Sequence, residues 1–278
     1  MIAIVLAVAA TATDKVDLRP EADFVVSGIA LLGAAVPQLM QTQLTPAHCR
    51  WCDGPDNTGL PGTGSQGTLN GVDAWFHDAM TGWLVSRGTA NTLSDVVGYV
   101  LVPAGAFVGA YTATGPYATT NAGWRAMAIV GESTLVSIAL VQGLKFTTVR
   151  KRPFVRYGTG DTSGGTYDVD APDSRLSFGS GHTAIAAGLT FSVATTATIQ
   201  ESEAAPWLWG AAAVSTVSVA ALRMMAEKHY FTDVLMGAAV GAGCGVVIPL
   251  LHKRGGPLSS DTVSVTAQGA AFAVSGRF

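Results

Sequence analysis

Long apolar stretches, separated by polar segments rich in glycine, recur along the chain. Most of them approach the roughly 20 residues that an α-helix needs to cross a bilayer. Strand-like alternation is nearly absent before residue 258. The pattern therefore predicts an all-α fold, a six-helix bundle that is transmembrane or membrane-associated. The six predicted helices cover residues 24–42, 93–114, 122–146, 182–199, 207–226 and 231–251.

Residues at the ends of these stretches are typical of helix boundaries. Asp95, directly after Ser94, suits the first turn of the second helix, and Pro206 precedes the fifth. The Gly-Gly-Pro sequence at 255–257 is expected to end the sixth helix. The boundary signals thus agree with the apolar pattern.

A loop-rich insertion follows the first helix. Residues 53–71 are rich in glycine and proline, and 73–85 predict a shorter amphipathic helix with Trp75, Phe76 and Trp83 on its apolar side. The C-terminal tail alternates in polarity and is either a short strand or disordered. The chain divides into a segment resembling a signal peptide at 1–12, a first helix with its outer loop and amphipathic helix at 13–92, a core at 93–254 and a tail at 255–278.

The two ends of the chain bear on its location. The apolar run at 1–12 ends in Ala-Thr-Ala, like a signal-peptide cleavage site, but has no basic region before it. Basic residues at 252–254 favour a cytoplasmic end for the sixth helix. The loops 43–92, 147–181 and 227–230 would then share the periplasmic or outer side of a cell envelope. A cleaved signal peptide would leave the N-terminus outside, which conflicts with six membrane spans and a cytoplasmic C-terminus. Either residues 1–12 are not cleaved, or some of the helices do not cross the membrane.

Composition supports a membrane setting and argues against nucleic acid. Apolar residues make up 49% of the chain and charged residues only 13%, about half the usual charged share. Mean hydropathy is +0.37, and the many small residues suit closely packed helices. With a net charge of −3, the chain has no basic field to attract nucleic acid.

Two of the three cysteines form a Cys-x-x-Cys pair, Cys49 and Cys52. Such a pair can be redox-active, half of a zinc site, or a local disulfide. No second Cys-x-x-Cys or His/Cys cluster completes a zinc site. In an exported loop, a small structural disulfide is the preferred interpretation, and no metal site is expected.

His229 and Asp233 stand four positions apart, a spacing that places two side chains on one helical face. A carboxylate on one imidazole nitrogen fixes the tautomer and leaves the other nitrogen free to attack an electrophile. Arg223, six residues before His229, indicates that the electrophile is an anion. Taken alone, a solvated ion pair at a helix end is the simpler interpretation.

A second cluster lies at the end of the third predicted helix. Lys145 stands seven residues before Arg152, about two helical turns, so both cations share one face. Pro153 then stops the helix. Cations here also complement the helix dipole, which is the structural alternative.

A third cluster, Ser180-Gly181-His182, directly precedes the fourth predicted helix. Free backbone N–H groups and a hydroxyl at a helix start suit an anion. An ordinary serine cap beside a bystander histidine is the alternative.

Together the three clusters are far more specific than any one of them. At this point the sequence resembles the type 2 phosphatidic acid phosphatase superfamily, which includes bacterial acid phosphatases, glucose-6-phosphatase and vanadium haloperoxidases. The resemblance covers roughly residues 93–251. Two positions depart from the family pattern, Gly179 in place of proline and Leu222 in place of serine. The matching residues are Lys145, Arg152, Pro153, Ser180, Gly181, His182, Arg223, His229 and Asp233.

The resemblance implies a role for each matching side chain. His229 would attack phosphorus to give a phosphohistidine, with Asp233 orienting its imidazole. His182 would protonate the leaving oxygen and then activate water. No metal or other cofactor is expected, because cations hold the phosphoryl oxygens. The phosphate-binding groups would be Lys145, Arg152, Ser180, Gly181 and Arg223.

The leading hypothesis is a phosphatase acting on a lipid-linked phosphomonoester or pyrophosphate, with the membrane and that lipid as its partners. A vanadate-dependent haloperoxidase would use the same pocket to hold vanadate on His229. The third alternative is a non-enzymatic envelope protein with a relic anion site. The presence of all the proposed catalytic side chains argues against it.

Other polar residues lie outside these clusters. Glu132, within the third apolar stretch, either pairs with a neighbouring helix or lines the site, and pairing is the preferred interpretation. Asp168, Asp170 and Asp173 could bind a cation, but their irregular spacing favours a solvated loop.

Overall fold

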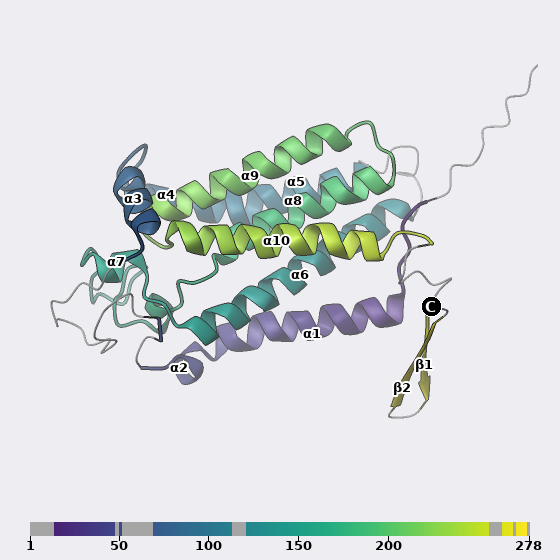
Figure 1. The fold of residues 1–278 in the computed structure, drawn as a ribbon, viewed down its shortest axis with the longest axis horizontal. Coiled ribbons are helices and arrows are strands. Elements are labelled where there is room, and N and C mark those ends of the chain that lie inside the picture. Colours follow the sequence, from purple (N-terminus) through teal and green to yellow (C-terminus); the bar gives the residue numbers. More distant parts are fainter. Residues whose placement is uncertain are drawn as a thin grey trace, which may run out of the picture.

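The computed structural model describes residues 14–47, 50–51, 69–112, 121–255, 263–268 and 271–276. Six long helices lie side by side in an elongated bundle (Figure 1), which confirms the predicted all-α class. The second of them is continuous and contains one π-helical turn. The long helices are α1 (Pro20–Leu39), α4 (Arg87–Val96) with η1 (Val97–Leu101) and α5 (Val102–Thr112), α6 (Ala122–Thr148), α8 (Gly181–Ile199), α9 (Ala205–Met225) and α10 (Phe231–Leu251).

Short elements decorate the two ends of the bundle. In the described tail, β1 (Val263–Gln268) and β2 (Ala271–Gly276) pair as an antiparallel hairpin, so the strand alternative is the one observed. The predicted signal peptide, Cys49 and Cys52 lie outside the described residues. The short helices are α2 (Gln41–Leu44), α3 (Gly71–Met80), α7 (Pro153–Arg156) and the 3-10 turn η3 (Pro172–Arg175).

Several helix starts differ from the sequence prediction, among them that of α1, which begins at Pro20 rather than 24. The second long helix begins at Arg87 rather than 93, because the side chain of Ser86 caps it by accepting a hydrogen bond from the backbone N of Thr89 (3.2 Å). Asp95 therefore lies in the last turn of α4 and not in a first turn. The amphipathic helix α3 begins two residues earlier than expected, capped by Asn70.

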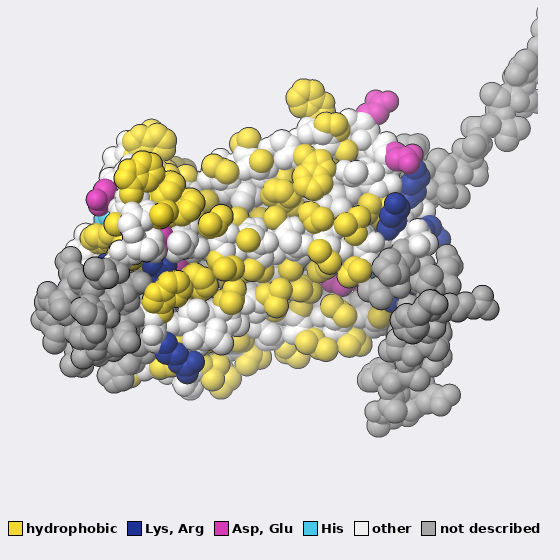
Figure 2. Space-filling view, viewed as in Figure 1, with side chains coloured by type: hydrophobic (Ala, Val, Ile, Leu, Met, Phe, Trp, Pro, Cys, Tyr) yellow, Lys and Arg dark blue, Asp and Glu magenta, His cyan; other side chains and the backbone are white. Residues whose placement is uncertain are grey.

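Among the described residues, five helical spans are long and apolar enough to cross a membrane. Hydrophobic side chains cover the middle of the visible face, and charged side chains gather towards the two ends (Figure 2). Helix α8 is not among the five, and most of its residues are buried. It packs against α5, α6, α9 and α10, so its small and hydroxyl-bearing side chains face other helices.

Three glycines of α10, spaced four residues apart, allow this helix to approach α8 closely. A Cβ on Gly237 would lie 2.4 Å from the carbonyl oxygen of Ser180. One on Gly241 would lie 2.4 Å from that of Ala184, and Gly245 meets α8 in the same way. This backbone contact, typical of small-residue packing in membranes, places the starts of α8 and α10 together at one end of the bundle.

The other end of the bundle is closed by the chain before α1. The backbone N of Asp17 donates to the carbonyl of His252 (2.8 Å), and that of Arg254 donates to the carbonyl of Lys15 (2.9 Å). This segment therefore lies along the residues that follow α10.

Candidate active site

The three polar clusters of the sequence meet at one end of the bundle. The end of α6, the start of α8 and the α9–α10 junction all reach this end (Figure 1). His229, in the junction, is buried, and its Nε2 lies 3.2 Å from Nη1 of Arg152. The positive charges of Arg152, Arg223 and Lys145 all act on this imidazole. The fold thus brings together the predicted nucleophile and three predicted phosphate-binding cations.

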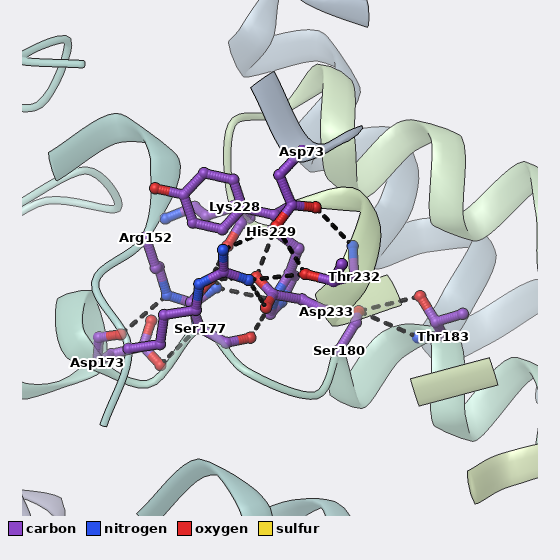
Figure 3. Close-up of polar contacts among 12 residues, drawn as sticks. Asp73, Arg152, Asp173, Ser177, Ser180, Thr183, Lys228, His229, Thr232 and Asp233 are labelled. Atoms are coloured by element: carbon purple, nitrogen blue, oxygen red, sulfur yellow. Dashed lines mark hydrogen bonds and ion pairs between the residues drawn. The ribbon is translucent and has the colours of Figure 1, made fainter. Parts of the chain in front are cut away.

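The imidazole of His229 is oriented by a backbone carbonyl. Its Nδ1 lies 2.8 Å from the carbonyl oxygen of Ser177, to which it donates, whereas Oδ2 of Asp233 is 3.8 Å away (Figure 3). With Nδ1 protonated, Nε2 keeps the lone pair that a nucleophile needs. Burial, with the charges of Arg152, Arg223 and Lys145, lowers the pKa of His229 well below its ordinary value. The ring is therefore neutral at physiological pH.

Asp233 does not contact the ring of His229 at hydrogen-bond distance but binds the residues around it. Its Oδ2 accepts from the Ser177 hydroxyl (2.6 Å) and from the backbone N of Tyr230 (2.9 Å). Its other oxygen accepts from Nη1 of Arg150 (2.8 Å). Asp233 thus acts on His229 through Ser177, whose carbonyl holds the ring.

Arg150 connects the insertion, through Asp73, to Asp233. Its Nη2 lies 2.8 Å from Oδ2 of Asp73, and both side chains are fully buried. Asp73, at the start of α3, also accepts from the backbone N of Thr232 (2.8 Å; Figure 3). Since a buried carboxylate is stable only when paired, these contacts tie α3 firmly to the first turn of α10.

Arg152 is held by groups on both sides of the site. Its Nη1 donates to the carbonyl of Lys228 (2.8 Å), and its Nη2 donates to Oδ1 of Asp173 (2.8 Å; Figure 3). Although burial opposes the charge on Asp173, Arg152 and Lys145 hold the pKa of that carboxyl well below its usual range. Asp173 is thus ion-paired and also partly exposed to solvent, with 44% of its side chain accessible. Its carboxylate contacts the arginine that is expected to hold phosphate.

The start of α8 lies close to Lys145. A Cβ on Gly181 would lie 3.7 Å from Nζ of Lys145. Ser180 is the N-cap of α8, and its Oγ accepts from the backbone N (3.4 Å) and the hydroxyl (3.0 Å) of Thr183 (Figure 3). Both contacts use the Ser180 oxygen as acceptor, so its own hydrogen is available to an anion. Ser180 can therefore cap α8 and still donate a hydrogen bond to an anion.

Arg223 and His182 both meet a polar face of α4. Nη1 of Arg223 donates to Oδ1 of Asn91 (3.1 Å) and to Oγ of Ser94 (3.0 Å). Nε2 of His182 lies 2.7 Å from Oδ1 of Asp95, which is 3.6 Å from Nη1 of Arg223.

Arg223 also has a donor to spare. Its Nε is buried and has no hydrogen-bond partner among the described residues. A buried, unsatisfied donor on a cation is suited to an incoming anion.

The π-helical turn of the second long helix lies against His182. A Cβ on Gly98 would lie 3.2 Å from Cδ2 of His182, and the hydroxyl of Tyr99 is 3.4 Å from its Nδ1. Such turns are frequent at functional sites because they shift side chains relative to the helix before them.

The prediction that Lys145 and Arg152 share one helical face is wrong, because α6 ends at Thr148 and the chain turns sharply between the two cations. Pro153 begins α7 and does not stop α6. Val149, which ends α6, has a φ of 47° and a ψ of 58°, the left-handed conformation. It is fully buried, and Arg150 and Arg152 follow it into the site.

Comparison with known families agrees with this geometry. Residues 126–256 match the family model described as the PAP2 superfamily. This match confirms the resemblance seen in the sequence. The family supports chemistry of the phosphatase or haloperoxidase type. Comparison with curated proteins and with solved structures gave no match.

Several residues of the site were not assigned to it from the sequence. They belong to the second long helix, to the insertion, or to the segment before α8, and each reaches the site through long-range contacts. Of these, only the carboxylates carried a usable signal, since buried charge in an apolar chain is costly and marks function or pairing. These residues are Asp73, Asn91, Ser94, Asp95, Tyr99, Asp173 and Ser177.

Proposed function

We propose that this chain is a membrane-embedded phosphatase that hydrolyses a lipid-linked phosphomonoester or pyrophosphate through a phosphohistidine. One observation above all supports the proposal. Nε2 of His229 keeps its lone pair because Nδ1 donates to the Ser177 carbonyl (2.8 Å), and that lone pair accepts a hydrogen bond from Nη1 of Arg152 (3.2 Å). A neutral nucleophile facing a cation that can hold the target oxyanion suits attack on phosphorus.

The reaction proceeds in two steps. Nε2 of His229 attacks phosphorus, and the bond from phosphorus to the leaving oxygen breaks. His182 gives that oxygen a proton. In the second step His182 takes a proton from water, the water oxygen bonds to phosphorus, and the phosphorus–nitrogen bond breaks.

The phosphoryl oxygens are met by cations and by donors at a helix start. Lys145, Arg152 and Arg223 supply the positive charge, and the unpaired Nε of Arg223 supplies a donor already in place. The Ser180 hydroxyl and the start of α8 add neutral donors. In this proposal the charge that develops on phosphate is stabilised by side chains without a metal ion.

An amphiphilic substrate agrees with the shape of the molecule. The site lies at one end of a bundle whose flanks expose large apolar side chains, among them Phe24, Leu32, Trp207 and Val247. A phosphate headgroup can approach from water while its lipid chains remain beside those flanks. We place the protein in a cell envelope, with this end facing the periplasm or outside.

The test is phosphate release in detergent from phosphatidic acid, phosphatidylglycerol phosphate, an isoprenoid pyrophosphate and a lipid A phosphate. At least one is expected to turn over in the presence of EDTA, and His229→Ala is expected to abolish release. An acid-labile, base-stable phosphoprotein is expected on rapid quenching of the wild type. Release that survives His229→Ala would exclude this nucleophile, and peroxide-dependent halide oxidation after vanadate loading would favour a haloperoxidase instead.

A further inference from the structure

At the end of the bundle opposite His229, three metal-ligating side chains converge. Asp23 lies in the first turn of α1, Glu132 in α6, and His252 directly after α10. One donor atom from each lies within 4.8 Å of the other two. Glu132 and His252 are buried, and Asp23 is half-buried. The three helices run side by side here (Figure 1).

The imidazole of His252 is oriented as in a metal site. Its Nδ1 lies 2.8 Å from the carbonyl oxygen of Ile248, to which it donates. Nε2 then carries the lone pair, points at the two carboxylates and has no hydrogen-bond partner among the described residues. Only 4% of the His252 side chain is exposed. Metal-bound histidines almost always donate their other nitrogen to a carbonyl or carboxylate in this manner.

The distances around Nε2 are compatible with those between the ligands of one metal ion. Nε2 is 3.3 Å from Oδ1 of Asp23 and 3.7 Å from Oε2 of Glu132. Hydrogen bonds of the N–H···O type are shorter, about 2.7–3.2 Å. Ligands at about 2.0–2.1 Å from a tetrahedral zinc ion stand about 3.3 Å apart. The three donors therefore surround a position that a metal ion would fill.

The charge of the cluster also calls for a cation. With the imidazole neutral, as metal binding through Nε2 requires, two ionised carboxylates would leave two negative charges in a mostly buried position, which is costly unless they are paired. Oδ2 of Asp23 accepts from the backbone N of Arg19 (2.6 Å), which leaves Oδ1 for the cluster. A divalent ion would balance both charges with one atom.

We propose that Asp23, Glu132 and His252 bind one divalent transition-metal ion, for which Zn²⁺ is the best match. One imidazole with two carboxylates is a ligand set that Zn²⁺ accepts, and imidazole disfavours Mg²⁺ and Ca²⁺. The ion ties α1, α6 and α10 together at the end where the chain before α1 also packs. Its role is structural, because the site lies at the far end of the bundle from His229 (Figure 1).

The experiment uses the untagged protein in detergent, treated with chelator and dialysed, with Cys49→Ser and Cys52→Ser introduced to remove competing thiolates. Zinc is titrated by calorimetry, and Co²⁺ is added as a spectroscopic probe of the ligands. One ion per chain is expected, with visible Co²⁺ bands and a higher midpoint of thermal unfolding. His252→Gln and Asp23→Asn are each expected to weaken Zn²⁺ binding by at least 100-fold.

His77→Gln is the matched control, because it removes a histidine at the other end of the bundle and is expected to bind Zn²⁺ like the parent. Circular dichroism and size exclusion verify that each variant is folded. If His252→Gln is unstable, Asp23→Asn still tests the site, because Asp23 is only half-buried. Absence of saturable Zn²⁺ binding, or equal binding by the parent and both cluster variants, overturns the proposal. In either case the cluster is an imidazolium between two carboxylates. Phosphate release is measured in parallel and is expected to be the same with and without Zn²⁺, so this test stands apart from that of the proposed function.

Discussion

Nε2 of His182 lies 2.7 Å from Oδ1 of Asp95, and this pair joins the predicted general acid to α4. The carboxylate orients the imidazole, whereas burial and the charges of Arg223, Lys145 and Arg152 lower the pKa of His182 well below its ordinary value. In the proposed mechanism the protonated ring donates to the leaving oxygen, and a carboxylate at hydrogen-bond distance favours that form. Asp95 lies before residues 126–256, which match the family model. A part of the chain outside the matched region therefore positions a residue inside it.

Asp95→Asn is expected to affect poor leaving groups most. An alkyl phosphate needs a proton on its leaving oxygen, whereas nitrophenolate leaves without one. We expect kcat to fall by roughly 10- to 100-fold with an alkyl phosphate and by much less with p-nitrophenyl phosphate, since general acids contribute about 10²- to 10⁴-fold. Steady-state kinetics with both substrates measure this, with Asp78→Asn, an exposed position, as the control. Equal losses with both substrates would mean that Asp95 only supports the fold.

Gly237→Ala tests whether the contact between α8 and α10 sets the site. The new Cβ would meet the backbone of Ser180 at 2.4 Å, so the start of one helix has to move. We expect kcat/KM to fall at least about 10-fold, because a displacement near 1 Å is costly for catalysis, and stability to fall by about 1–3 kcal/mol. Gly243→Ala is the matched control, because its Cβ would meet nothing within 4 Å. Similar behaviour of the two variants in kinetics and thermal unfolding would contradict the idea.

Asp173→Asn is expected to strengthen the binding of inorganic phosphate. The carboxylate occupies Nη2 of Arg152 (2.8 Å) and offsets one positive charge of the pocket. Removing that charge favours an anionic ligand. We expect the inhibition constant of phosphate to fall by about 3- to 10-fold. Asp170→Asn, an exposed position in the same loop, should leave it unchanged. Weaker inhibition in Asp173→Asn would show that Asp173 positions Arg152 for phosphate.

Glu227 gives a prediction about stability and pH. Burial opposes its charge, but hydrogen bonds from His77, Thr159 and Arg87 lower its pKa from the ordinary 4.5 to about 2. A carboxyl with a depressed folded-state pKa stabilises the protein above pH 4.5, and this contribution is lost as the pH falls towards 2.

Glu227→Gln is therefore expected to lower the free energy of unfolding by about 1–3 kcal/mol at pH 7. The difference from the wild type should shrink between pH 4.5 and pH 2. Unfolding in denaturant across this range measures it, with the exposed Glu203→Gln as control. A difference that stays constant down to pH 2 would mean that the charge of Glu227 is not the cause.

The sequence was sufficient for the bundle and for the centre of the site. Apolar stretches of membrane-spanning length exist only where helices exist, so all six long helices could be predicted. Lys145, His182 and His229 each stand at a helix boundary, and boundaries on one side of an antiparallel bundle meet. Their convergence followed from local pattern alone.

The supporting residues could not be predicted, because their signal is not local. Asp73 and Asp95 are single carboxylates in polar surroundings, and only the folded chain shows that they pair with Arg150 and His182. The start of α4 was misplaced for the same reason. Its first two turns contain Asn91 and Ser94, which accept hydrogen bonds from Arg223. The apolar pattern therefore begins after the helix does.

The left-handed turn at Val149 bears on how this site is assembled. A β-branched residue with a φ of 47° is a strained choice, costing roughly 1–2 kcal/mol relative to ordinary helical or extended backbone. Local preference in the chain opposes this corner, so packing around the fully buried valine has to impose it. The arginines beyond the corner therefore reach their places only when the bundle closes. We therefore expect the phosphate-binding arginine to take its place in the same step in which this end of the bundle folds.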